Sequence, residues 1–111
     1  MALTHMPGWT AAQRADAAVK AKILNDGETV VLQTERSGKP AVSRYRSSGG
    51  QVPADSDVDH AIDLQLGGAD TVENMWPLNS SVNRSFGVQI RHRIKNMRPG
   101  TVINKVTIGD R

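Results

Sequence analysis

Residues 58–86 limit the possible folds of this chain more than any other segment, and they read VDHAIDLQLGGADTVENMWPLNSSVNRSF. Residues 58–62 are predicted to form a short strand, and the glycine pair at 67–68 a turn. Residues 71–75 are predicted to form a second extended piece, which Pro77 stops. The segment therefore predicts two short strands, joined by a glycine turn, on the N-terminal side of Pro77.

A helix is predicted to follow, with Asn79 or Ser80 as its N-cap, and to run to about Met97 before Arg98-Pro99-Gly100 ends it. Asn83 falls in the inward sector of this helix, where a polar side chain needs a partner. The helix also presents an apolar face, made of Val82, Phe86, Ile90, Ile94 and Met97. Strands and helix together predict an α+β fold.

In the N-terminal half, Thr10 and Gln13 form a capping-box pattern at the start of a helix that residues 25–27 end. Residues 28–35 and 41–46 are predicted to be two strands of a hairpin. The packing face predicted for the helix consists of Ala12, Ala15, Val19 and Ile23.

The remaining segments are predicted more simply. Residues 47–53 are rich in Ser and Gly and indicate a flexible connection, and residues 102–108 indicate one final strand. No structural role is predicted for residues 1–6. Residues 1–50 would thus support a motif at residues 56–97, within a single domain of residues 1–111.

Composition excludes several classes of protein. The 111 residues contain no cysteine, which rules out disulfide frameworks, thiol nucleophiles and cysteine-ligated zinc. No apolar run approaches the roughly 20 residues of a membrane helix, and no signal peptide is recognisable. We therefore expect a soluble protein without a membrane partner, which, if exported, travels as part of something larger.

Charge is segregated along the chain. Residues 55–73 contain six acids and no Lys or Arg, whereas residues 74–109 contain six bases and no acid. An acidic segment can hold a divalent cation and a basic one attracts a polyanion. Taken alone, this segregation is better explained by solvated faces that neutralise one another, and the motif in the central segment reverses that preference.

The polar residues of the central segment point to more specific chemistry. Its order is an acid and a histidine at Asp59-His60, then Asn74, then Asn83, interleaved with the glycine pair and Trp76-Pro77. This order resembles the HNH nucleases, whose ββα-metal site cuts nucleic acid. The resemblance covers roughly residues 56–97, and residues 1–50 match no family.

The resemblance implies a role for each of these residues. His60 would be the general base and Asp59 the metal ligand beside it, which requires an irregular or bent strand end. Asn74 would tie the loop and orient the base, and Asn83 would be the second metal ligand. Because an Asn carbonyl is a hard ligand, magnesium or manganese is favoured, with zinc and nickel as alternatives. Asp63 departs from the family pattern, which often has proline there.

The implied activity is metal-dependent endonuclease cleavage of DNA that leaves 5′-phosphate and 3′-hydroxyl ends. DNA would be held through its phosphates with little sequence selectivity, since no base-reading module is left over. The residues expected to contact phosphate are Arg84, Arg91, Lys95 and Arg98 on one stripe of the helix, with Arg44 and Arg46 on the hairpin.

The same central segment is similar to C-terminal nuclease domains of bacterial polymorphic toxins. That similarity implies an antibacterial effector that belongs to, or is cargo for, a larger delivery protein, acts in the cytoplasm of a target bacterium, and is blocked by a cognate immunity protein. A phage or restriction-type HNH nuclease, or a catalytically silent basic module that binds nucleic acid, are the alternatives.

Each residue also has a plainer interpretation. His60 could be an ordinary strand histidine, Asn74 a loop cap and Asn83 a residue that caps the helix. His92 is expected at the surface. Arg93 is expected to be either a buried ion-pair partner or a phosphate clamp.

Overall fold

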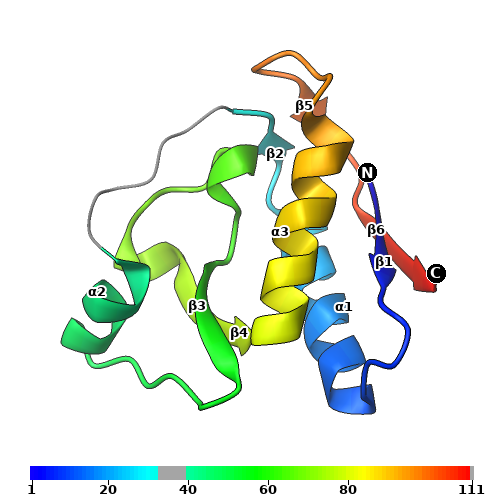
Figure 1. Cartoon of the computed structure of the whole chain (residues 1–111). Helices are drawn as coiled ribbons and strands as arrows, with labels where there is room; N and C mark the ends of the chain where they lie inside the picture. The colour runs from blue at the N-terminus through cyan, green and yellow to red at the C-terminus, as the bar shows by residue number, and fades with distance from the viewer. Residues whose placement is uncertain (33–39, 111) are drawn as a thin grey trace.

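The fold is α+β, as predicted, with helices and strands intermixed along the chain (Figure 1). The computed structural model describes residues 1–32 and 40–110. The core is a cluster of aliphatic side chains and Phe86, to which α1 contributes Leu24 and α3 contributes Val82 and Ile90. Its small side chains agree with a chain that has only 4% aromatic residues.

In the part of the chain that the structure describes, the strands pair in twos, as β1 with β6, β2 with β5 and β3 with β4. Two short 3-10 turns, Leu64–Leu66 and Val72–Asn74, lie between β3 and β4. Within the described residues, no helix combines the length and apolar character needed to cross a bilayer. The helices and strands are β1 (Ala2–His5), α1 (Ala11–Asp26), β2 (Thr29–Val30), α2 (Ala41–Ser47), β3 (Ser56–His60), β4 (Met75–Asn79), α3 (Ser80–Ile94), β5 (Val102–Ile103) and β6 (Thr107–Asp110).

Helix α1 begins as predicted but packs through a different face. Thr10 Oγ1 accepts from the Gln13 backbone at 3.1 Å, and the Gln13 side chain accepts from the Thr10 backbone at 2.8 Å, so the capping box is confirmed. The predicted packing face is wrong, because Ala12, Ala15 and Val19 are exposed and Ile23 is only half-buried. The buried face of α1 consists of Ala17, Lys20, Ala21 and Leu24.

The predicted hairpin is wrong in its second half. Residues 41–47 form α2 instead of a strand. Ala41, Val42 and Tyr45 lie on one face of a helix, but Ala41 and Tyr45 also share one face of a strand, and a short segment of this kind follows its tertiary contacts. In the first half only Thr29–Val30 is a strand, and residues 33–39 lie outside the described part of the chain. The predicted connection at 47–53 begins with the last residue of α2.

Strands β3 and β4 form an antiparallel pair in which Asp59 lies opposite Trp76 and His60 opposite Met75. The prediction that Pro77 stops the second extended piece is wrong, because Pro77 lies inside β4. The two-stranded sheet explains this, since a strand with a free edge loses no ladder bond when proline lacks an N–H on that side. Residues 72–74, predicted to be extended, form a 3-10 turn.

The two ends of the chain meet in a parallel pair, β1 with β6. Residues 1–6, to which no role was assigned, contribute Leu3, which is 1% exposed and belongs to the core. The single strand predicted over residues 102–108 is two strands, β5 and β6. Figure 1 shows both termini on the α1 and α3 side of the molecule, away from α2.

Helix α3 starts directly after β4. The Asn79 side chain accepts from the backbone of Ser81 and Val82 and caps the helix as predicted. The helix ends at Ile94, earlier than the predicted Met97, which is 37% exposed and takes no part in the apolar face. The rest of that face is confirmed as buried.

Candidate active site

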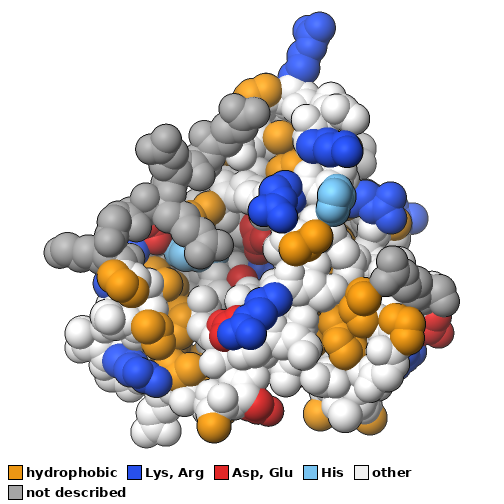
Figure 2. Space-filling view, in the orientation of Figure 1, with side chains coloured by type: hydrophobic (Ala, Val, Ile, Leu, Met, Phe, Trp, Pro, Cys, Tyr) orange, Lys and Arg blue, Asp and Glu red, His pale blue; other side chains and the backbone are white. Residues whose placement is uncertain are grey.

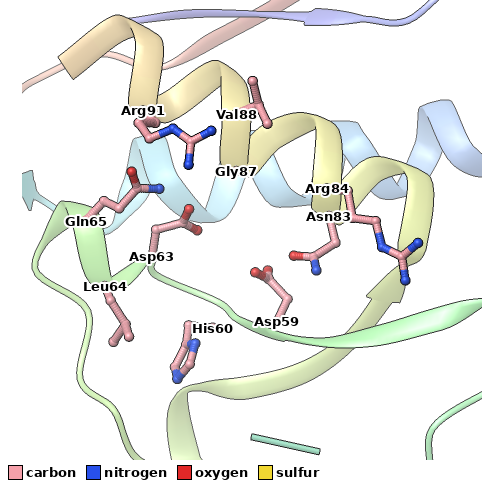
Figure 3. A pocket seen from close by; sticks show the side chains of 10 residues that line it. All are labelled: Asp59, His60, Asp63, Leu64, Gln65, Asn83, Arg84, Gly87, Val88 and Arg91. Carbon is pink, nitrogen blue, oxygen red and sulfur yellow. The ribbon is translucent and has the colours of Figure 1, made fainter. Parts of the chain in front are cut away.

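A pocket of about 450 Å³ lies between the end of β3, the loop after it and one face of α3 (Figure 3). Its lining includes Asp59, His60 and Asn83 from the expected catalytic and metal-binding set, whereas Asn74 lies outside it. The lining residues are Asp59, His60, Asp63, Leu64, Gln65, Asn83, Arg84, Gly87, Val88 and Arg91.

Asp59 is buried at the floor of this pocket. Its Oδ2 accepts from Lys20 Nζ at 2.7 Å and from the indole Nε1 of Trp76 at 2.9 Å. Burial raises the pKa of the Asp59 carboxyl above its ordinary value; the Lys20 ammonium opposes this rise and the neighbouring Asp63 adds to it. No hydrogen bond reaches Asp59 Oδ1 within the described structure, so this oxygen remains available to a ligand in the pocket.

Lys20 makes four contacts at the end of β3. Besides Asp59, its Nζ lies 2.6 Å from Asp63 Oδ1 and donates to the carbonyl oxygens of His60 at 2.6 Å and Ala61 at 2.9 Å. Successive carbonyls of a regular strand point in opposite directions, so two that reach one ammonium mark a departure from regular geometry. This agrees with the irregular strand end expected after Asp59.

His60 is oriented by a carboxylate. Its Nε2 lies 2.9 Å from Asp70 Oδ1, which also accepts from Arg44 Nη1 at 2.8 Å, while Arg44 Nη2 donates to the Asp70 carbonyl at 2.6 Å. An ionised carboxylate only accepts, so Nε2 holds the ring proton of a neutral His60 and Nδ1 keeps its lone pair. That arrangement suits a general base.

Asn83 reaches the pocket from the first turn of α3. Its Nδ2 donates to Asp57 Oδ2 at 3.0 Å, so the amide oxygen is the end left for the pocket, and Figure 3 shows the Asn83 amide and the Asp59 carboxyl turned to the same space. Although burial opposes it, the hydrogen bonds from Asn83, Ser80 and Arg84 lower the pKa of Asp57. Asp57 therefore fixes which end of the Asn83 side chain faces the pocket.

Asn74 ties the loop between β3 and β4. Its Nδ2 donates to the carbonyls of Ile62 and Ala69, each at 2.9 Å, and its Oδ1 accepts from the Ile62 backbone at 3.0 Å. Gly68 allows this, because a Cβ there would lie 1.7 Å from the Ile62 carbonyl oxygen. Asn74 thus performs the loop-tying part of its expected role, whereas the side chain that contacts His60 is Asp70.

The basic residues predicted to hold DNA are not equivalent. Arg84 and Arg91 line the pocket, and Figure 2 shows Lys and Arg side chains on this face around recessed acidic groups. Arg84 is partly engaged, because its Nε and Nη2 each lie 3.2 Å from an oxygen of Asp57. Lys95 caps the C-terminus of α3 and Arg98 lies beyond it, so the predicted stripe is not a continuous helix face.

Three further basic residues have other positions. Arg44 is bonded to Asp70, and Arg46 is exposed on α2 instead of on a hairpin. Arg93 is exposed and donates to the Ala2 carbonyl at 3.1 Å, so the buried ion pair considered for it is wrong. His92 is exposed, as expected.

The residues present fit a hard divalent cation that keeps most of its water. Asp59 offers one charged oxygen and Asn83 one neutral oxygen, and Mg²⁺ is commonly held by one or two carboxylates, its remaining positions filled by water and phosphate. Over residues 1–32 and 40–110, no cluster of three or more His, Cys, Asp or Glu side chains could hold a metal. One charged and one neutral oxygen suit a weak oxygen site.

Two contributors to this site were missed by sequence reasoning. Lys20 lies at helical spacing with Ala17, Ala21 and Leu24, and a lysine in line with apolar residues is a signal that could have been found. Asp70 was counted only as one acid of a charged segment. Nothing local distinguishes it, because its partner His60 lies ten residues away across a loop.

Comparisons of this chain with protein-family models, with curated proteins and with solved structures found no match.

Proposed function

We propose that this chain is a metal-dependent endonuclease that hydrolyses DNA with little sequence specificity, through a ββα-metal site made of β3, β4 and α3. One observation supports this most: Asp59, His60 and Asn83, which come from a strand end and a helix start, line the same polar pocket. The arginines at its rim suit a phosphate backbone.

In this proposal His60 Nδ1 takes a proton from water, and the water oxygen attacks phosphorus as the bond from phosphorus to the 3′ oxygen breaks. The departing 3′ oxygen takes a proton from solvent water. Asp70 keeps the His60 ring oriented and stabilises the imidazolium that forms. Asp59 and Asn83 would hold the cation, which supplies charge neutralisation at the phosphate. Arg91, exposed at the rim, would position the adjacent phosphate. The products are a 5′-phosphate and a 3′-hydroxyl.

A plasmid-nicking assay tests the proposed activity directly. We expect the purified chain to convert supercoiled plasmid to open-circle and linear forms with magnesium or manganese, and EDTA to abolish this conversion. Binding of plasmid without any nicking under either metal would instead favour a silent nucleic-acid-binding module.

A double variant, Arg91→Ala/Lys95→Ala, tests whether these two side chains bind DNA phosphates. Neither side chain contacts Asp59, His60 or Asn83 by a hydrogen bond, so turnover with saturating DNA at low salt should persist. Each lost phosphate contact should flatten the slope of log K against log salt by about 0.9, independently of DNA sequence. Fluorescence anisotropy across a salt series measures this slope.

Arg46→Ala is the matched control for that double variant, because Arg46 is exposed on α2 and lines no part of the pocket. An unchanged salt slope in the double variant, together with a flattened slope in Arg46→Ala, would place the DNA on the α2 side instead.

The delivery context belongs to the same proposal. We expect the chain to act as an antibacterial effector in the cytoplasm of a target bacterium, as part or cargo of a larger delivery protein, and to be neutralised by a cognate immunity protein. Expression in the bacterial cytoplasm should degrade chromosomal DNA, and co-expression of a small neighbouring gene should prevent the damage.

A further inference from the structure

One of the largest fully buried side chains in the described structure is a lysine next to the pocket. Lys20 is 1% exposed, and its ammonium contacts two carboxylates and two carbonyl oxygens, all between 2.6 and 2.9 Å. A buried ammonium is costly unless paired, so a position that only needed filling would favour an apolar residue. The other buried residues of α1 are Ala and Leu, which shows what that helix face otherwise uses.

The charges around Lys20 set the electrostatics of the pocket floor. Asp59 and Asp63, which both line the pocket, carry two negative charges, and Lys20 neutralises one of them. A divalent cation at Asp59 Oδ1 would therefore be attracted by a cluster of net charge about −1. It would also be repelled by the Lys20 ammonium, which is bonded to the other oxygen of the same carboxyl group.

We propose that Lys20 is a positioning residue with two effects: it fixes Asp59 and the strand end at His60, and it keeps the metal affinity of the free protein low. This inference rests on the proposed metal site. The cation would bind firmly only when a DNA phosphate adds its own negative charge and oxygen ligand. Helix α1, from the half of the chain outside the resemblance, is then an integral part of the site.

Lys20→Met is the direct test, with Mn²⁺ as the probe and no DNA present. Repulsion between a unit charge and a divalent ion roughly 5 Å apart, even at an effective dielectric constant of about 20, corresponds to more than tenfold in affinity. We expect calorimetry to show manganese binding to Lys20→Met at least about tenfold more tightly than to the wild type. Without metal its Tm should fall by more than about 10 °C, because the buried Asp59 and the half-buried Asp63 carboxylates lose their cation. Saturating manganese should recover much of that loss.

Lys22→Met is the matched control, since Lys22 lies on the same helix but is exposed and pairs only with Asp26. It should leave manganese affinity unchanged. Asp63→Asn provides an independent test of the same charge balance if Lys20→Met fails to fold. It removes one negative charge from the cluster, so manganese affinity should fall at least about tenfold.

A folded Lys20→Met or Asp63→Asn variant with wild-type manganese affinity would overturn the role of Lys20 while leaving the proposed function intact. If Lys20→Met does not fold with or without manganese, Asp63→Asn alone decides. Absence of manganese binding by the wild type, with and without a non-cleavable DNA, would overturn the metal site and this inference together.

Discussion

We expect His60→Ala to lower the rate of DNA cleavage by at least about 10²-fold while DNA binding persists. The pocket holds one imidazole, and its Nε2 is committed to Asp70, so the variant loses the group that would take the proton from water. The imidazole is not part of the apolar core cluster, and the Asp70 carboxylate keeps Arg44 as a partner. The fold should therefore survive, and plasmid nicking with saturating magnesium measures the loss.

His92→Ala is the control for this prediction, because His92 is exposed and lines no part of the pocket. Asp70→Asn is the informative companion. It keeps the shape of the side chain but removes the charge that orients the ring and stabilises the imidazolium, so cleavage should fall by less than in His60→Ala. Nicking by His60→Ala at the rate of the wild type would remove His60 from the role of base.

We expect Asp59→Asn to weaken manganese binding at least about tenfold and to reduce cleavage accordingly, because it replaces a charged oxygen ligand with a neutral one. Asn83→Ala should weaken binding less, since it removes a ligand that was already neutral. Calorimetric titration with manganese gives both affinities.

Both variants should fold. In Asp59→Asn, Lys20 keeps Asp63 and the carbonyls of His60 and Ala61, and in Asn83→Ala, Asp57 keeps Ser80 and Arg84. Asp26→Asn is the control that removes an exposed carboxylate on α1. If manganese binds equally well to Asp59→Asn, Asn83→Ala and the wild type, the metal is held elsewhere.

Local signals in the sequence predicted the elements that frame the site. The Thr10 capping box and the Asn79 cap act over one helical turn, and each is present in the structure. The apolar face of α3 was predicted correctly as far as Ile94, because its spacing leaves only one side on which these residues can be buried together. The glycine turn was also predicted, and it needs glycine at position 68 because the Ile62 carbonyl lies too close to leave room for a side chain there.

Predictions failed where a short segment has two workable periodicities. Residues 41–46 were predicted to be a strand and instead lie in a helix, Ala41–Ser47, in which Arg44 bonds to Asp70. Several faces of α1 carry small residues that could be buried, and the face that is buried is the one that contains Lys20. Tertiary contacts decided both cases, since the difference in intrinsic preference was small.

Short-range signals in the sequence were enough to predict the caps, the glycine turn, the buried face of α3 and the candidate residues Asp59, His60, Asn74 and Asn83. The contacts that those residues make depend on the packing of distant segments. Lys20 and Asp59 are 39 residues apart, and Arg44 and Asp70 are 26 apart, so their pairing depends on how α1 and α2 pack and not on any local pattern. The charges that surround the candidate base and the candidate metal ligand come from these distant partners, because the fold brings them within hydrogen-bond reach and buries them together.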